Sequence, residues 1–388
     1  MGRIGLDKLG VVIAIIAMCG ILLPFATFRA NRIVAGEGRT IFEALPVWAA
    51  ITLVCVLGTA TLIGLMRFGI LWRLAAGVAA LVALLVLIGL TPGHLTPDGN
   101  TYARVSPASG FWLLSFAFTL LITDSLARLD LRPAARVGAL GLAALALGAI
   151  LLSGSWNGLS ILKEYANRAD SFWTEGATHL ELALGSLAAA VTVGIPLGIL
   201  CHRVPVLRDA VLNVLNIIQT IPSIALFGLL IAPLGWIALH VPGASAIGIR
   251  GIGAPPAFIA LFLYSLLPVV ANTVAGLAGV PPAANEAARG MGMTTWQRLF
   301  QIEFPLAFPV ILTGIRIVLV QNIGLATIAA LIGGGGFGVF VFQGIGQTAM
   351  DLVLLGAVPT VALAFAAAVI LDAITEMSTF NGSRKVSA

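Results

Sequence analysis

The sequence predicts an all-α, polytopic membrane protein with about ten transmembrane helices. Hydrophobic residues make up 59% of the 388 positions and charged residues only 10%, whereas a soluble domain has about 25% charged residues. The 44 glycines fit the same class, because small residues let membrane helices approach closely.

A transmembrane helix needs about 20 mostly apolar residues, and ten segments come near this length. Their approximate limits are 9–28, 45–66, 70–91, 110–127, 134–153, 178–201, 209–232, 256–279, 309–332 and 352–375. Cytoplasmic loops carry an excess of Lys and Arg. Thirteen of these residues fall on the side of the N-terminus and seven on the other side, with Arg316 inside a span. We therefore expect both termini, and the segment 285–309, in the cytoplasm.

The composition divides the chain into four parts. Residues 1–153 form a five-span membrane region with few polar groups inside its spans, and the sequence assigns it no role. Residues 154–177 are polar and contain tryptophan, which predicts a linker along the outer surface. Residues 178–375 form a second membrane region that is richer in Pro, Asn, Gln and Thr, and residues 376–388 form a cytoplasmic tail.

The segment 285–309 is the most polar interruption of the second membrane region. Its pattern predicts a short helix, a Gly-containing turn and a second short helix that Pro305 and Pro309 interrupt. Glu303 is a possible partner for Arg316 in the following span. Because the segment cannot cross a bilayer, we expect a partner protein to dock on it.

Polar residues recur inside three consecutive spans of the second region. Pro222 predicts a kink in the seventh span, where the polar positions share one helical face. Such residues either join helices by hydrogen bonds or line a passage. We favour a substrate pathway, formed by Asn216, Gln219, Thr220, Ser223, Tyr264, Asn272, Gln321 and Asn322.

Several functional classes lack their motifs. There is no GxxxxGK[ST], HExxH or paired-Cys pattern, so we expect no bound ATP, catalytic site, metal or other cofactor. Basic residues are scattered, which argues against nucleic-acid binding. Residues 333–338 match GxGxxG formally, but no strand precedes them, so we expect an outer turn or re-entrant loop. Few acidic residues lie in spans, chiefly Glu181 and Asp372, which argues against a proton-driven carrier.

The cytoplasmic segment resembles the EAA loop of permeases in binding-protein-dependent ABC importers, which have a type I core. The matching residues are Glu286, Ala287, Ala288, Gly292, Ile302 and Pro305, and Phe304 replaces the usual Leu. The resemblance implies a coupling helix that docks on separate cytoplasmic ATP-binding subunits, so that this chain is not itself an enzyme. It further implies a second permease subunit (a copy or a relative), an extracytoplasmic substrate-binding protein and a bacterial inner membrane.

A closer resemblance is to osmoprotectant permeases, which handle glycine betaine, choline, carnitine and proline betaine. It rests on the stretches 219–226, 264–273 and 326–333 and extends over about 178–375. It implies ATP-driven import of osmoprotectants such as glycine betaine or choline. Three alternatives remain open: an importer of amino acids such as methionine, a secondary carrier or channel without an ATPase, and a membrane scaffold for an ATPase.

Overall fold

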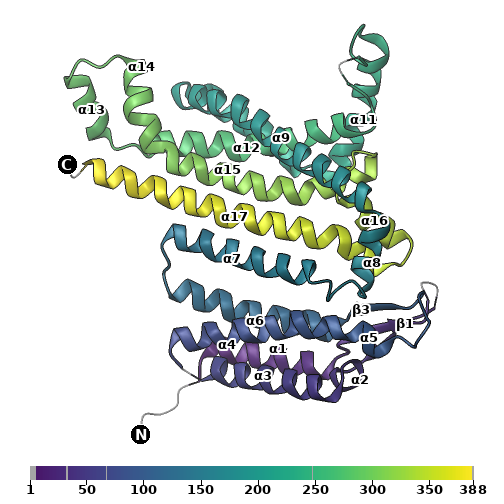
Figure 1. Cartoon of the computed structure of the whole chain (residues 1–388). Coiled ribbons are helices and arrows are strands. Elements are labelled where there is room, and N and C mark those ends of the chain that lie inside the picture. Colours follow the sequence, from purple (N-terminus) through teal and green to yellow (C-terminus); the bar gives the residue numbers. More distant parts are fainter. Residues whose placement is uncertain (1–5, 32–33, 67, 247, 387–388) are drawn as a thin grey trace. The chain divides into compact units, whose positions relative to one another are not determined.

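The computed structural model describes residues 6–31, 34–66, 68–246 and 248–386. The chain divides into two compact units after Asn167, and each is described by itself (Figure 1). Within the described ranges, nine helices are long and apolar enough to cross a membrane, and one shorter apolar helix precedes them. The prediction of a helical membrane protein with about ten spans is confirmed. The segment 154–177 is shared between the units and is largely helical.

The N-terminal unit is a bundle of apolar helices with a small antiparallel sheet at one end, in the strand order β2-β1-β3. Its elements are α1 (Lys8–Leu22), β1 (Ala26–Arg29), β2 (Glu37–Arg39), α2 (Ile41–Ala44), α3 (Val47–Leu65), α4 (Ile70–Leu87), α5 (Thr91–Leu95), β3 (Arg104–Pro107), α6 (Ser109–Arg128), α7 (Pro133–Leu152) and α8 (Ser160–Asn167). Its core contains Phe25, Leu53, Leu84 and Phe118. Helix α7 has no buried residue.

The first span is shorter than the predicted 9–28. Helix α1 ends at Leu22, because Leu23 takes an extended conformation ahead of Pro24. A residue that precedes proline is driven out of the helical region by contact with the proline ring. The following residues form β1 instead, which pairs with β2 on one side and β3 on the other.

Four charged side chains close a ring in the N-terminal unit. Arg73 donates hydrogen bonds to Asp7 at 2.9 Å and to Asp124 at 3.3 Å, and Arg128 donates to the same two carboxylates at 3.1 and 2.9 Å. Asp7 also caps α1 by accepting the N–H of Leu9 at 3.0 Å. The hydrogen bond from Arg73 holds the pKa of Asp7 well below its usual range, against the opposing effect of burial. The ring therefore ties α1, α4 and α6 together without net charge.

Replacing Arg73 by methionine is expected to destabilise the N-terminal unit strongly. The Arg73 side chain is only 3% exposed, and its removal leaves two carboxylates without their shared buried partner. Breaking a buried pair in this way costs about 3–5 kcal/mol. The protein is heated in detergent, and size-exclusion chromatography measures the temperature at which half of it has aggregated. Arg128→Met is the matched control, because this arginine is 42% exposed; equal losses in the two variants would contradict the assignment.

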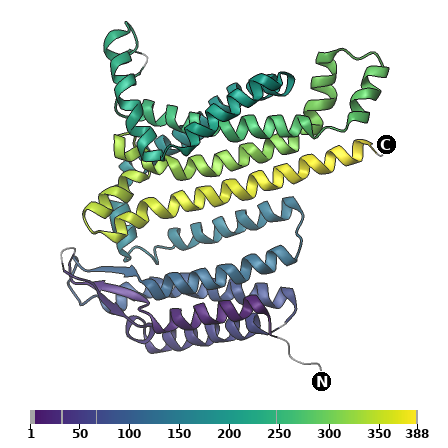
Figure 2. The ribbon, with the colours of Figure 1, turned by 180° about the vertical axis from the view of Figure 1, so that it is seen from behind.

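The C-terminal unit contains the longer helices. Its elements are α9 (Ala169–Arg203), α10 (Pro205–Thr220), α11 (Ser223–His240), α12 (Ala254–Ala278), α13 (Pro282–Gly290), α14 (Thr295–Arg298), α15 (Phe304–Ala326), α16 (Gly338–Gly346) and α17 (Met350–Val386). A π-helical turn, Leu299–Glu303, joins α14 to α15, and a 3-10 turn, Thr327–Ile332, follows α15. Helices α9, α12 and α15 pack side by side in both views (Figures 1 and 2).

The predicted seventh span, 209–232, is wrong as a single helix. The chain breaks at Ile221-Pro222 into α10 and α11, and Ile221 is extended. The sequence suggested a kink at Pro222. The residue before a proline is disfavoured in the helical region, and here this preference ends α10 altogether.

Glycines let the central helices approach one another closely. A Cβ atom at Gly198 of α9 would lie 2.6 Å from the Thr273 side chain of α12, and one at Gly314 of α15 would lie 2.7 Å from Asn272. Small residues at helix contacts are the usual means by which membrane helices pack. This packing brings the polar groups of the three helices within hydrogen-bonding distance.

The Gly-rich segment after α15 forms a tight turn. Gly333, Gly335 and Gly336 have φ values of +75°, +77° and +85°, a region that residues with a Cβ atom rarely adopt. The turn leads into α16, a helix that the sequence did not predict. The backbone N–H of Gly336 donates to a carboxylate oxygen of Glu175 on α9 at 2.6 Å.

Candidate functional site

The segment between α12 and α15 forms two short helices joined by a glycine turn. Helix α13 ends at Gly290, and Gly292, two residues later, takes the left-handed conformation with φ +78°. The N–H of Met293 then donates to the carbonyl of Ala288 at 3.1 Å. Thr294 and Gln297 then form a reciprocal capping box that starts α14. The predicted helix, turn and helix are therefore present, and Gly292 occupies the position that requires glycine.

The outer face of this loop is apolar as well as charged. Glu286 and Ala287 are exposed, whereas Ala288 is buried and lies on the inward face of α13. Trp296 and Phe300 are 69% and 59% exposed, and their rings stack with centroids 5.9 Å apart. We call Glu286, Ala287, Met291, Trp296 and Phe300 the coupling surface; all five are exposed. An exposed aromatic cluster beside charged groups is typical of a protein-binding site.

The base of the loop is anchored in the transmembrane helices. Glu303 forms an ion pair with Arg203 at the end of α9, and the Glu303 side chain is only 4% exposed. The sequence had suggested Arg316 as its partner. That pairing is wrong, because Arg316 reaches Asp372 of α17 instead.

Pro305 does not end the second short helix, contrary to expectation. The chain passes from α14 through the π-helical turn directly into α15, and Pro305 occupies its first turn. Proline is tolerated there because the first N–H groups of a helix have no partner within it. Helix α15 also continues through Pro309, and Ile302 is half-buried within the π-helical turn.

Two predicted pathway residues join α10 to α12. The Gln219 side chain donates to the carbonyl of Tyr264 at 2.8 Å, and the Tyr264 hydroxyl donates to the carbonyl of Ile221. Pro268 lies four residues after Tyr264 and lacks the N–H that would otherwise bond this carbonyl. Gln219 therefore satisfies an acceptor that the proline leaves open.

A second group of polar side chains lies at the centre of the packed helices. The Asn322 amide donates to Ser186 and to Ser265, both at 2.9 Å, and all three residues are fully buried. This cluster links α15 to α9 and α12. Asn272 donates to the Pro268 carbonyl of its own helix at 2.8 Å. Ser186 was not predicted, since a lone serine in an apolar span gives no signal of its partners.

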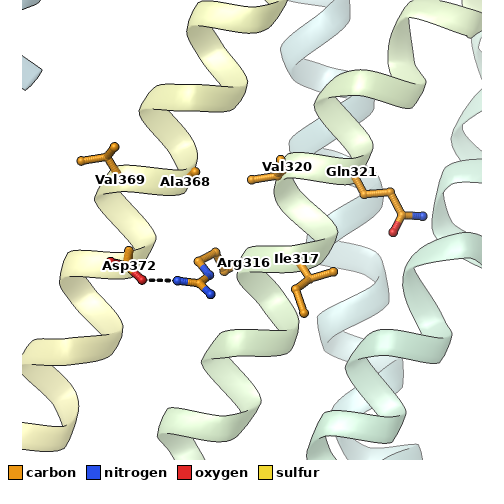
Figure 3. Close-up of a pocket in the computed structure, with 7 residues that line it drawn as sticks. All are labelled: Arg316, Ile317, Val320, Gln321, Ala368, Val369 and Asp372. Carbon is orange, nitrogen blue, oxygen red and sulfur yellow. Dashed lines mark hydrogen bonds and ion pairs between the residues drawn. The ribbon is translucent and has the colours of Figure 1, made fainter. Parts of the chain in front are cut away.

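The other predicted pathway residues remain accessible within the C-terminal unit. Asn216 and Thr220 are exposed on α10, and Ser223 is half-buried at the start of α11. Gln321 lines a groove between α15 and α17 together with Arg316 and Asp372 (Figure 3). The structure thus separates the eight residues into a buried or hydrogen-bonded group and an accessible group. It does not bring them into one site.

Both halves of the chain match known families. Residues 194–378 match the family described as binding-protein-dependent transport system inner membrane component. Residues 7–162 match the family described as ABC transporter permease YehY, N-terminal domain. The N-terminal unit, to which the sequence assigned no role, is thus similar to a domain found in an ABC transporter permease.

Three curated relatives cover about half of this chain and most of their own lengths. Osmoprotectant import permease protein OsmW of Salmonella typhimurium is 43% identical over 53% of this chain and 91% of its own. Glycine betaine/carnitine/choline transport system permease protein OpuCB of Bacillus subtilis is 37% identical, over 54% and 90%. Carnitine transport permease protein OpuCB of Listeria monocytogenes is 39% identical, over 48% and 78%.

Among solved structures, an inward-facing conformation of the MetNI methionine ABC transporter resembles 54% of this chain and 95% of the matched chain. The TM-score is 0.47 and the sequence identity 22%, a likeness too distant to indicate a substrate. The family match and the relatives at 37–43% identity are sufficient for assignment. The chain belongs to the binding-protein-dependent transport system inner membrane components, the multi-pass permease subunits of ABC importers.

Proposed function

We propose that this permease imports osmoprotectants of the quaternary ammonium type, such as glycine betaine or choline, and is driven by ATP hydrolysis on a separate subunit. The observation that carries the proposal is the exposed coupling surface around Glu286, on a chain without an ATP-binding motif. The names of the relatives, which include glycine betaine, carnitine and choline permeases, support the substrate class.

The proposed import requires three kinds of partner subunit. Cytoplasmic ATP-binding subunits dock on the coupling surface, a second permease completes the membrane assembly, and an extracytoplasmic binding protein delivers the substrate. The excess of Lys and Arg on the side of the termini supports a cytoplasmic position for both ends and for the coupling surface. The assembly lies in the inner membrane of a bacterium.

The structure offers a route by which movement of the coupling surface reaches the membrane. Trp296 of α14 and Phe300 of the π-helical turn stack on each other, and this stretch runs without a break into α15. Helix α13 precedes it, across the Gly292 turn. The ion pair between Glu303 and Arg203 ties the π-helical turn to α9. Closure of the ATP-binding subunits therefore moves α9 and α15 together, and the Asn322 cluster carries this motion to α12.

Reconstituted transport tests the proposal directly. The permease, its ATP-binding subunit and its binding protein are placed in proteoliposomes, and uptake of radiolabelled glycine betaine, choline, carnitine and methionine is compared. We expect uptake of the quaternary ammonium compounds that requires both ATP and the binding protein. Uptake without an ATP-binding subunit would establish a carrier or channel, and preferential uptake of methionine would establish an amino-acid importer.

The accessible face of α10 is expected to line the substrate pathway. Asn216→Leu removes an exposed amide from this face and should lower the uptake rate several-fold, because an apolar side chain offers the passing substrate no hydrogen bond. Val214→Leu on the same helix is the control, since Val214 is also exposed but already apolar. An unchanged rate in Asn216→Leu would indicate that this face does not contact substrate.

A further inference from the structure

A groove between α15 and α17 contains two opposite charges within the helices. Its volume is about 570 Å³, within the range of small-molecule sites. Four apolar side chains and the polar side chains of Arg316, Gln321 and Asp372 line it (Figure 3). Arg316 and Asp372 reach toward one another from the two helices and form an ion pair.

This ion pair is open, unlike the buried pairs elsewhere in the chain. The Arg316 and Asp372 side chains are 32% and 44% exposed, whereas Arg73 and Asp7 are 3% and 9% exposed. Charged side chains inside transmembrane helices face water or a polar partner, because hydrocarbon penalises them. Because both side chains are also partly exposed, the groove can admit water or a polar ligand.

Holding two helices together does not require this pair. Helices α15 and α17 pack against each other along much of their length, and apolar side chains stabilise such a contact as well as an ion pair does. Ionisable residues inside a membrane are therefore expected to have a function. The groove presents one positive charge, on Arg316, and one negative charge, on Asp372, to a ligand.

A small zwitterion matches the chemistry of the groove. The guanidinium of Arg316 can donate two parallel hydrogen bonds to a carboxylate. The Asp372 carboxylate attracts a quaternary ammonium group, which has no N–H to donate, through charge alone. The methyl groups of such an ammonium fit against the apolar lining, which includes Val320 and Val369.

We propose that the groove is a transient binding site for a small zwitterion, in which Arg316 binds the carboxylate and Asp372 faces the cationic group. The ligand replaces the pair between Arg316 and Asp372 by a pair with each side chain, so both keep an oppositely charged partner. The exchange keeps the affinity low, as release into the cell requires. This inference rests on the proposed function, because the zwitterion is taken to be the transported substrate.

Cysteine labelling tests the site without requiring transport. Ala368→Cys, in a background lacking Cys19, Cys55 and Cys201, places a thiol in the groove of the permease complex in membrane vesicles. We expect a charged, water-soluble maleimide to label it, and glycine betaine to slow the labelling several-fold. Choline, which lacks a carboxylate, and sorbitol at equal osmolality should slow it much less.

Ile370→Cys is the matched control. Ile370 lies on the same helix at nearly the same depth and is 41% exposed, but it does not line the groove. Glycine betaine should leave its labelling rate unchanged. Failure of the maleimide to reach Ala368→Cys, or equal protection by sorbitol, would overturn the site even where ATP-driven uptake is present. Protection without uptake would preserve the site and refute the proposed function.

Charge removal identifies the residues that hold the ligand. In the Ala368→Cys protein, Arg316→Gln should abolish protection by glycine betaine. The double variant Arg316→Gln/Asp372→Asn removes both members of the Arg316–Asp372 pair together and guards against misfolding of the single variant. Protection should also be lost in the double variant. Protection that persists there would overturn the proposal.

Discussion

Glu286→Lys is expected to reduce ATP-driven uptake at least tenfold while the protein still inserts into the membrane. Glu286 is exposed on α13 and belongs to the coupling surface. Placing a like charge opposite a partner's basic group costs several kcal/mol, and each ~1.4 kcal/mol lowers affinity tenfold. The measurements are uptake in proteoliposomes and co-purification of the ATP-binding subunit.

The control for Glu286→Lys is the same change of charge outside the coupling surface. Asp209→Lys alters a carboxylate that is 71% exposed near the start of α10, and it should leave uptake and subunit binding close to normal. Trp296→Ala should weaken binding of the ATP-binding subunit as Glu286→Lys does, because aromatic anchors carry much of the energy of an interface. Normal uptake by Glu286→Lys would show that the subunit docks elsewhere.

The sequence predicted the local geometry of the coupling loop but not its exposed surface. The position of Gly292 followed from the turn that a helix end requires, and the structure places this glycine at a positive φ. The spacing of apolar residues could not distinguish Leu299, which is buried, from Trp296, which is exposed. That distinction depends on how the loop rests on neighbouring helices, which are distant in the sequence.

The polar residues inside the spans show the same limit. Helical periodicity places polar residues on one face of a helix, but it does not show whether that face contacts another helix or remains accessible. Asn216 and Gln219 are close on α10, yet Asn216 is exposed and Gln219 bonds a carbonyl of α12. Pro268 determines the partner of Gln219, because its missing N–H leaves the carbonyl of Tyr264 free to accept from Gln219 on another helix.

The charged ring of the N-terminal unit was beyond sequence reasoning for a related reason. Asp7, Arg73 and Asp124 are widely separated along the chain and lie at or near helix ends, where isolated charges are common. Nothing in their spacing indicates that three helices bring them together. Conversely, the broad class, the approximate number of transmembrane helices and the glycine turn depend on composition and local geometry, and these were predicted correctly.

The Gly-rich turn after α15 packs closely against the start of α16. Gly338 begins α16, and a Cβ atom there would lie 1.8 Å from the backbone oxygen of Thr327. Backbone cannot move aside as a flexible side chain can, so alanine would force α16 away from the turn that precedes it. The turn also carries Gly336, whose N–H bonds Glu175 of α9. Displacing α16 therefore disturbs the contact between the turn and a central helix.

Gly338→Ala is consequently expected to abolish uptake and to lower the yield of folded protein several-fold, since overpacking by rigid contact costs about 1–3 kcal/mol or more. Gly346→Ala is the matched control at the other end of α16, where an added Cβ meets no atom within 4 Å. This variant should fold and transport normally, or with slightly higher stability, because alanine favours a helix over glycine. Yield and monodispersity are measured by size-exclusion chromatography in detergent, and uptake in proteoliposomes. Equal behaviour of the two variants would mean that α16 does not pack tightly on the turn, and α16 would then be free to move independently of α9.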